Sequence, residues 1–168
     1  MPRFEAKNVS KADVPASREE IWALVSSSES LAELTPLVKR ITADADRWCW
    51  QLTSISVFGV HIEPSFTEQM HFVEGRRITF EHRPPPGTSE RAGATGVYTL
   101  EDSATGGTHL SVDITLHVEL PLPALLRRTV ERVMASMMAR TGAKFARNLY
   151  ARLGVNGASN AIATRVGG

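Results

Sequence analysis

The sequence predicts an α+β fold: a curved antiparallel sheet wrapped around a long C-terminal helix, with two short helices after the first strand. Two observations carry this prediction. From Leu110 to Leu120 apolar side chains occupy every second position, which is typical of a strand with one buried face. After Pro121 the apolar period becomes about 3.6 residues, and it continues to about Leu153. A helix of ~30 residues spans ~45 Å, so it can lie across a whole sheet.

The same two patterns indicate which side chains face inward. On the strand, the polar alternates are expected to face solvent: Ser111, Asp113, Thr115, His117 and Glu119. On the helix, one face carries a mostly apolar set: Leu122, Leu126, Val130, Val133, Met137, Thr141, Phe145 and Leu149. The space between this helix face and the inner face of the sheet is where we expect the protein to act.

The N-terminal part predicts one strand followed by two short helices. Residues 3–14 alternate weakly and indicate the strand. Ser17 can cap the first helix, because Glu20 follows at the spacing of a capping box. The serine-rich run 26–30 is expected to break that helix. A second short helix, residues 31–34, should end before Pro36, since the residue that precedes a proline resists helical dihedral angles.

The middle of the chain is rich in strands and turns. Strands are predicted at residues 38–42, 47–57, 61–73, 77–82 and 93–101. The proline-rich run 83–89 cannot join a central ladder and should form an exposed loop. We expect one domain over residues 1–153 and a flexible tail over residues 154–168.

Composition narrows the classes of function. The 168 residues are 42% hydrophobic and 22% charged, which is ordinary for one globular domain. No apolar run reaches membrane-spanning length, and the first residues lack a signal-peptide pattern. Cys49 is the one cysteine, so we expect no internal disulfide and a cytoplasmic location. We predict no metal site and no cofactor, since zinc-type spacings and phosphate-binding glycine loops are missing.

Basic residues dominate the predicted C-terminal helix, where Glu131 is the one acid. The basic residues are Arg127, Arg128, Arg132, Arg140, Lys144, Arg147 and Arg152. One interpretation is a solvated helix face, and the other is a surface for an anionic membrane or partner. Nucleic acid is not expected as a partner, because exposed aromatic residues do not accompany the charge. The sequence leaves open whether the protein forms a homodimer.

Several short motifs occur in an order that resembles a known superfamily. They lie at residues 14–22 (Val-Pro-Ala-Ser, then Ile-Trp), 74–80, 96–100 and 107–112. Together with the final strand-to-helix step, they resemble the START-like helix-grip superfamily over about residues 3–153. That superfamily includes lipid-transfer domains, plant pathogenesis-related proteins and polyketide cyclase/dehydratase-like proteins. Residues 119–123 resemble a poorly characterised subgroup, which gives no reaction that could be assigned to this chain. Fold alone does not imply function.

The resemblance implies a cavity between the last helix and the concave face of the sheet. Its expected walls are Trp48, Trp50, Phe66, Met70, Phe80, Tyr98, Leu116, Val133, Met137, Thr141 and Phe145. The alternative is that these residues fill an ordinary core, since apolar stripes usually do. A minority of them would then contact a ligand.

Glu68 is the strongest polar candidate, because it occurs in an otherwise apolar strand register. A buried carboxylate there would have a raised pKa, as general acids and bases do. The alternative is a local bulge that turns Glu68 to solvent. His82 and Tyr98 could complete a proton relay with it, or could be core-edge residues that each make one hydrogen bond.

Three hypotheses of function follow. The first is a binding or carrier protein for a small hydrophobic molecule such as a lipid, polyketide or isoprenoid. The second is a cyclase or dehydratase that uses Glu68 with His82 or Tyr98 and needs neither metal nor nucleotide. The third is an interaction or membrane-surface module that uses the basic helix. The sequence favours the first, because one carboxylate is too few for acid–base catalysis.

Overall fold

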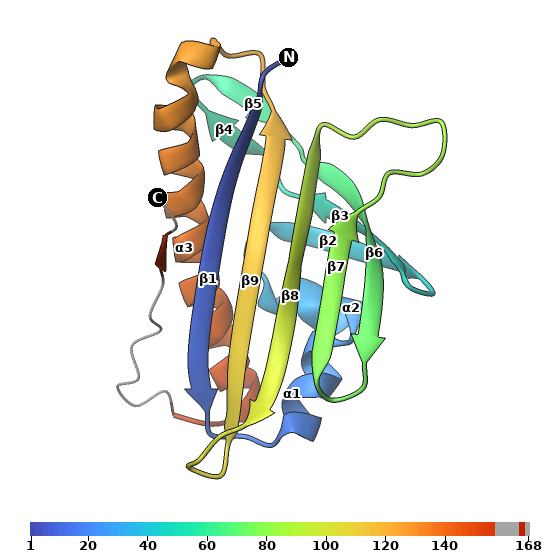
Figure 1. Cartoon of the computed structure of the whole chain (residues 1–168), viewed down its shortest axis with the longest axis vertical. Coiled ribbons are helices and arrows are strands. Elements are labelled where there is room, and N and C mark those ends of the chain that lie inside the picture. The colour runs from blue at the N-terminus through green and yellow to red at the C-terminus, as the bar shows by residue number, and fades with distance from the viewer. Residues whose placement is uncertain (157–164, 167–168) are drawn as a thin grey trace.

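The computed structural model describes residues 1–156 and 165–166, and it has the predicted α+β architecture (Figure 1). The helices are α1 (Arg18–Val25), α2 (Ser28–Leu34), the 3-10 turn η1 (Ala124–Leu126) and α3 (Arg127–Leu153). The main sheet contains β1 (Arg3–Val14), β2 (Val38–Asp44), β3 (Arg47–Leu52), β6 (Ser65–Val73), β7 (Arg77–His82), β8 (Ala92–Asp102), β9 (Thr108–Glu119) and β10 (Arg165–Val166). A separate hairpin contains β4 (Ile55–Val57) and β5 (Val60–Ile62).

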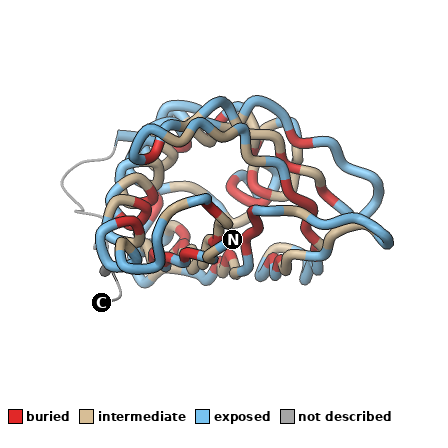
Figure 2. The backbone as a smooth tube through the Cα atoms, turned by 90° about the horizontal axis from the view of Figure 1, so that it is seen from above, coloured by how far each residue is buried: buried red, intermediate tan, exposed pale blue. Residues whose placement is uncertain are grey.

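The main sheet is antiparallel throughout, in the order β10-β1-β9-β8-β7-β6-β3-β2. The first strand therefore pairs with the last long one, from Arg3 opposite Glu119 to Val14 opposite Thr108. Helix α3 runs along β1, and seen from above the backbone encircles a central space (Figures 1 and 2). Most of the predicted tail, residues 157–164 and 167–168, lies outside the described residues.

The two short helices begin at serine caps. Ser17 accepts a hydrogen bond from the Glu20 amide, while the Glu20 carboxylate accepts one from the Ser17 amide, so the predicted capping box is confirmed. The second helix begins at Ser28, three residues earlier than predicted. The Ser27 hydroxyl accepts from the Ser30 amide, so the serine run starts this helix as well as ending the first.

Two of the predicted strands are each divided. Residues 47–57 and residues 61–73 were each expected to form one continuous strand. The end of the first range and the start of the second instead leave the main sheet and pair as the β4–β5 hairpin. Phe58 and Gly59 both have positive φ, which suits a two-residue hairpin turn. Pro64 has no N–H to donate to a ladder, and it marks the point where the chain rejoins the main sheet.

The inner face predicted for β9 is confirmed, but its outer face is less exposed than predicted, since Ser111, Asp113, Thr115 and Glu119 are half-buried. Leu110 and Leu120 are buried, and the apolar residues between them are half-buried because they line a cavity. The expectation that His117 faces solvent is wrong, since it is 8% exposed. Its imidazole packs edge-on against that of His82, with 4.8 Å between ring centroids.

Gly93 leaves the room that this edge-on contact between the two imidazoles needs. A Cβ atom at this position would overlap both the His82 and the His117 ring. We therefore expect Gly93→Ala to lower the free energy of unfolding by roughly 1–3 kcal/mol, as overpacking does. Gly142→Ala is the matched control, because its Cβ would meet its neighbours at an ordinary 3.5 Å. In the middle of α3 it should stabilise by about 0.5–1 kcal/mol. Urea unfolding measures both, and equal effects would contradict the packing argument.

Candidate functional site

A cavity of about 260 Å³ lies between the concave face of the sheet and α3. It separates two apolar clusters of the core, one around α1 and α2 and the other around the start of α3. The clusters share Ile114, Leu116 and Val118, which are half-buried and line the cavity. The interior is therefore left unfilled in the middle of the sheet.

Most of the predicted wall residues line this cavity. They are Trp50, Phe66, Met70, Phe80, Tyr98, Leu116, Met137, Thr141 and Phe145. Trp48 and Val133 do not. Trp48 is buried against Phe72, with 5.7 Å between ring centroids. Val133 lies about 100° around the helix from Met134, which does line the cavity.

Sequence reasoning missed two parts of the wall. Ile55, Val57 and Ile62 line the cavity from the β4–β5 hairpin, which was predicted as parts of longer strands. Asn8 lines it from β1, directly opposite Ile114 of β9. The alternation of Phe4, Ala6 and Asn8 was the signal available for this position, and all three are buried.

Glu68 is 2% exposed and lies in the cavity wall, so the alternative that a bulge turns it to solvent is wrong. Burial raises its pKa from 4.5 to about 8. The Trp50 indole N–H, which lies beside the carboxylate, opposes part of that shift. Neither Glu68 Oε2 nor Trp50 Nε1 has a hydrogen-bond partner among the described residues.

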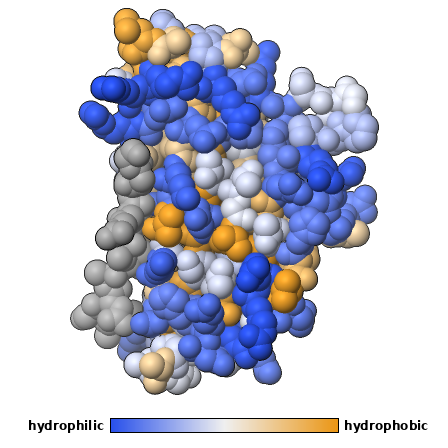
Figure 3. Space-filling view, viewed as in Figure 1, coloured by the Kyte–Doolittle hydropathy of each residue, from blue (hydrophilic) through white to orange (hydrophobic). Residues whose placement is uncertain are grey.

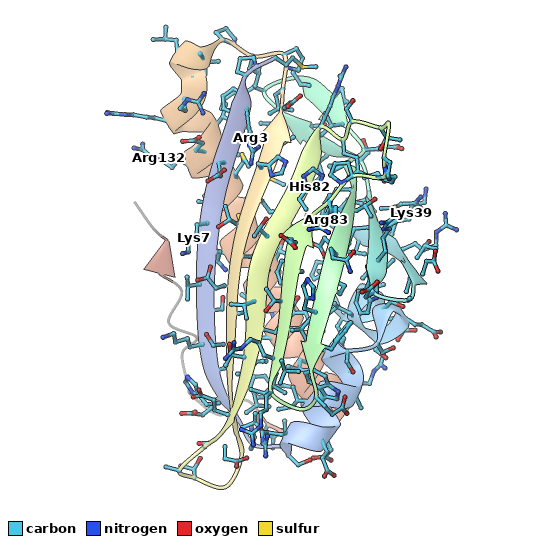
Figure 4. The ribbon with its side chains drawn as sticks, turned by 45° about the vertical axis from the view of Figure 1, so that its right-hand side comes forward. Arg3, Lys7, Lys39, His82, Arg83 and Arg132 are labelled. Carbon is cyan, nitrogen blue, oxygen red and sulfur yellow. The ribbon has the colours of Figure 1, made fainter. Side chains whose placement is uncertain are left out.

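His82 does not join Glu68, although the two residues are opposite each other in the β6–β7 register. The His82 Nε2 lies 2.9 Å from Glu90 Oε2, and the Glu90 carboxylate also accepts from the Thr67 amide and hydroxyl at 2.8 Å. Figure 4 shows His82 beside Arg83 at the end of β7. His82 is thus committed to anchoring the loop after β7, and it is not a cavity residue.

Tyr98 does lie in the cavity wall, 6% exposed. Burial raises the pKa of its hydroxyl above the usual range, and the nearby Glu68 carboxylate raises it further. Tyr98 is therefore a neutral phenol at physiological pH. Of the three catalytic candidates, the structure brings Glu68 and Tyr98 to the same cavity and leaves His82 outside.

Asn8 adds a third polar group to the wall. Its Nδ2 donates to the Ser10 hydroxyl at 3.1 Å, while its Oδ1 is buried and has no partner among the described residues. The buried side-chain atoms without partners in that part of the chain are Asn8 Oδ1, Trp50 Nε1 and Glu68 Oε2. All three belong to residues that line the cavity.

Among the described residues, ion pairs or hydrogen bonds engage two of the basic side chains of α3. Arg127 bonds Glu131 and the carbonyl of Arg3, and Arg152 pairs with Glu33. Arg132 projects from α3 away from the sheet (Figure 4). Hydrophobic residues gather at the end of the molecule where α3 begins (Figure 3), and Leu125 there is 94% exposed. Binding of this surface to an anionic membrane stays a prediction.

Among the described residues, no group of three or more histidine, cysteine or acidic side chains is placed to hold a metal ion. No described helix has the length and hydropathy needed to cross a membrane.

Residues 5–154 match the family model described as polyketide cyclase/dehydrase and lipid transport. The chain belongs to this family. Among curated proteins, none matches the chain.

Solved structures share the fold at low sequence identity. A conserved protein from Geobacillus kaustophilus is 13% identical with a TM-score of 0.68, and the match covers 95% of this chain and 99% of that one. A START superfamily protein from Mycobacterium smegmatis is 17% identical with a TM-score of 0.63, covering 89% and 97%. The Zhui aromatase/cyclase from a Streptomyces species is 10% identical with a TM-score of 0.61, covering 90% and 93%.

The raised pKa of Glu68 predicts how stability depends on pH. A carboxyl with a folded-state pKa of about 8 and an ordinary value of 4.5 binds its proton more tightly when folded. Its contribution to stability is therefore present below pH 4.5 and is lost as pH rises toward 8. Glu68→Gln should become more stable relative to wild type across this window, by roughly 1–4 kcal/mol.

Urea unfolding at several pH values between 4.5 and 8.5 measures this difference, and a difference that does not change with pH would contradict it. Glu63→Gln removes a carboxylate from an exposed position and serves as the control.

Proposed function

We propose that the protein binds and carries a small hydrophobic molecule in the cavity between the sheet and α3. The observation that carries this proposal is an apolar cavity whose wall contains buried polar atoms without partners. Apolar walls stabilise a ligand by roughly 25 cal/mol per Å² of buried apolar area, and a few polar groups orient it. Lipid transport in the family's description supports the same function.

The cavity wall suits ligands of varied shape on its α3 side. Met134, Met137 and Met138 all line the cavity. Methionine side chains are flexible and adapt to irregular surfaces. On the sheet side, Phe80 packs against Tyr98 and Trp50 stacks on Phe66, so this wall is aromatic and more rigid.

Filling the cavity tests whether the ligand binds there. Met137→Trp should reduce the affinity for a hydrophobic probe such as Nile red at least tenfold, because the larger side chain occupies the space. Its free energy of unfolding should stay within about 1–2 kcal/mol of wild type, since the site is not a filled core. Fluorescence titration and urea unfolding measure the two quantities.

Ser136→Trp places the same side chain at a neighbouring exposed position of α3 and should leave probe binding unchanged. Severe destabilisation by Met137→Trp would show that the space is too small for a ligand. Equal loss of binding in both variants would mean that the probe binds elsewhere.

A second candidate function is a cyclase or dehydratase, and the observation that favours it is Glu68 itself. A carboxyl with a pKa of about 8 is mostly protonated at neutral pH and can donate a proton to a bound substrate. Tyr98 lies in the same wall and can hydrogen-bond a carbonyl oxygen. The structural likeness to an aromatase/cyclase is a likeness of fold. Neither a metal nor a nucleotide is required for this chemistry.

Glu68→Gln separates the two functions, because it keeps shape and hydrogen bonding and removes the titratable proton. Any molecule that copurifies with the protein, found by native mass spectrometry, is incubated with both variants. We expect its mass to stay unchanged with wild type, as for a carrier. Turnover that Glu68→Gln lowers by ~10²–10⁴-fold, with affinity retained, would establish the enzyme instead. Tyr98→Phe removes the Tyr98 hydroxyl and is measured in the same assay.

A further inference from the structure

Among the described residues, the buried polar atoms of the cavity wall without hydrogen-bond partners lie at two separate places, which we call the inner pole and the outer pole. The inner pole is Trp50 Nε1 with Glu68 Oε2, and the outer pole is Asn8 Oδ1. Each atom is buried and has no partner among the described residues. Folded proteins leave few such atoms, because an unpaired buried donor or acceptor is costly. A ligand that supplies the missing partners is therefore favoured over a pure hydrocarbon.

The inner pole requires an oxygen atom that carries no charge. Trp50 and Glu68 lie on the neighbouring strands β3 and β6 and meet in the cavity wall. The indole N–H only donates, so it needs an acceptor. A hydroxyl can accept from Trp50 and donate to Glu68, and a ketone oxygen can accept from Trp50 and from a protonated Glu68. An ammonium cannot accept from Trp50, and a carboxylate would have to bury its charge in a mainly apolar wall.

The outer pole requires a hydrogen-bond donor. The Asn8 Nδ2 is occupied by Ser10, which leaves Oδ1 as the free acceptor of the amide. Asn8 lies on β1, directly opposite Ile114 of β9, and so on the concave face. A ligand hydroxyl can supply the proton that this oxygen lacks.

The two poles lie on opposite sides of the cavity. In the sheet order β1-β9-β8-β7-β6, four strand spacings separate Asn8 from Glu68. At about 4.8 Å each they amount to ~19 Å along the curved sheet, and the direct path across the cavity is shorter. The rest of the wall is mainly apolar, with Ile114, Phe80 and Met137 among its residues, and its other polar side chains include Tyr98 and Thr141.

We infer that the ligand is an uncharged, mainly apolar molecule with an oxygen function at each end: a hydroxyl or ketone at Trp50 and Glu68, and a hydroxyl at Asn8. This inference rests on the proposed binding function and specifies its ligand class. It excludes fatty acids and long-chain amines as the preferred ligands.

Matched ten-carbon probes test the inference by displacement of Nile red at pH 7. They are 1-decanol, 1,10-decanediol, decanoic acid and decylamine. The diol should bind at least as tightly as the alcohol, although its second hydroxyl must leave water. The acid and the amine should bind at least tenfold more weakly than the alcohol. A preference for either charged probe would overturn the inference.

Variants at each pole assign the contacts. Asn8→Leu should weaken the diol roughly 3- to 10-fold and leave the alcohol unchanged, because only the diol reaches the outer pole. Trp50→Phe should weaken both probes by a similar factor. Thr95→Val, at an exposed position of β8 outside the cavity wall, is the control and should change neither. Binding of 1-decanol also shows that each variant is folded.

The outcomes separate this inference from the binding function. If no probe binds, or if Met137→Trp does not block binding, the binding function itself fails. Suppose that 1-decanol binds in the cavity, that wild type binds the diol more weakly than 1-decanol, and that Asn8→Leu does not weaken diol binding further. The binding function then stands, and the two-pole ligand is overturned. In that case water satisfies Asn8.

Discussion

The pairing of β1 with β9 is the interaction on which the cavity depends. The two strands are opposite each other along their whole length, from Arg3 and Glu119 to Val14 and Thr108. This pairing leaves β1 near the end of the sheet, with only the two-residue β10 beyond it among the described residues, and α3 packs mainly against β1 (Figure 1). A helix held at the edge of a curved sheet cannot fill its concave centre. The unfilled centre is the cavity, and Asn8 of β1 reaches its wall because of the same pairing.

The sequence predicted those parts of the fold that local chemistry determines. The bounds of β1 and β7 and the capping box at Ser17 and Glu20 are as predicted, because alternation and capping act between near neighbours. The division of residues 47–73 into four strands was missed. The turn at Phe58 and Gly59 falls in the gap between the two predicted strands, but the breaks at residues 53–54 and 63–64 were not predicted. The sheet that each strand joins depends on partners elsewhere in the chain.

The candidate site shows the same limit. Period-two alternation identified Glu68 and most of the aromatic wall, because those strands keep one face toward the cavity. It could not show that His82 turns to Glu90, since that contact depends on the path of the loop between them. The burial of His117 was missed for a related reason: it requires Gly93 on the neighbouring strand to leave room for two imidazoles.

The cavity wall presents neutral groups, and this favours binding over acid–base chemistry. Tyr98 keeps its proton because burial raises its pKa, and Glu68 keeps its own up to about pH 8. The imidazole of His82, one of the three catalytic candidates, is engaged by Glu90 outside the cavity. A dehydration needs one group to give a proton and another to take one. Glu68 can give a proton. Tyr98 cannot take one, because it is too weak an acid to be present as a phenolate. Neutral donors and acceptors in an apolar wall are instead suited to hold uncharged oxygen atoms in place.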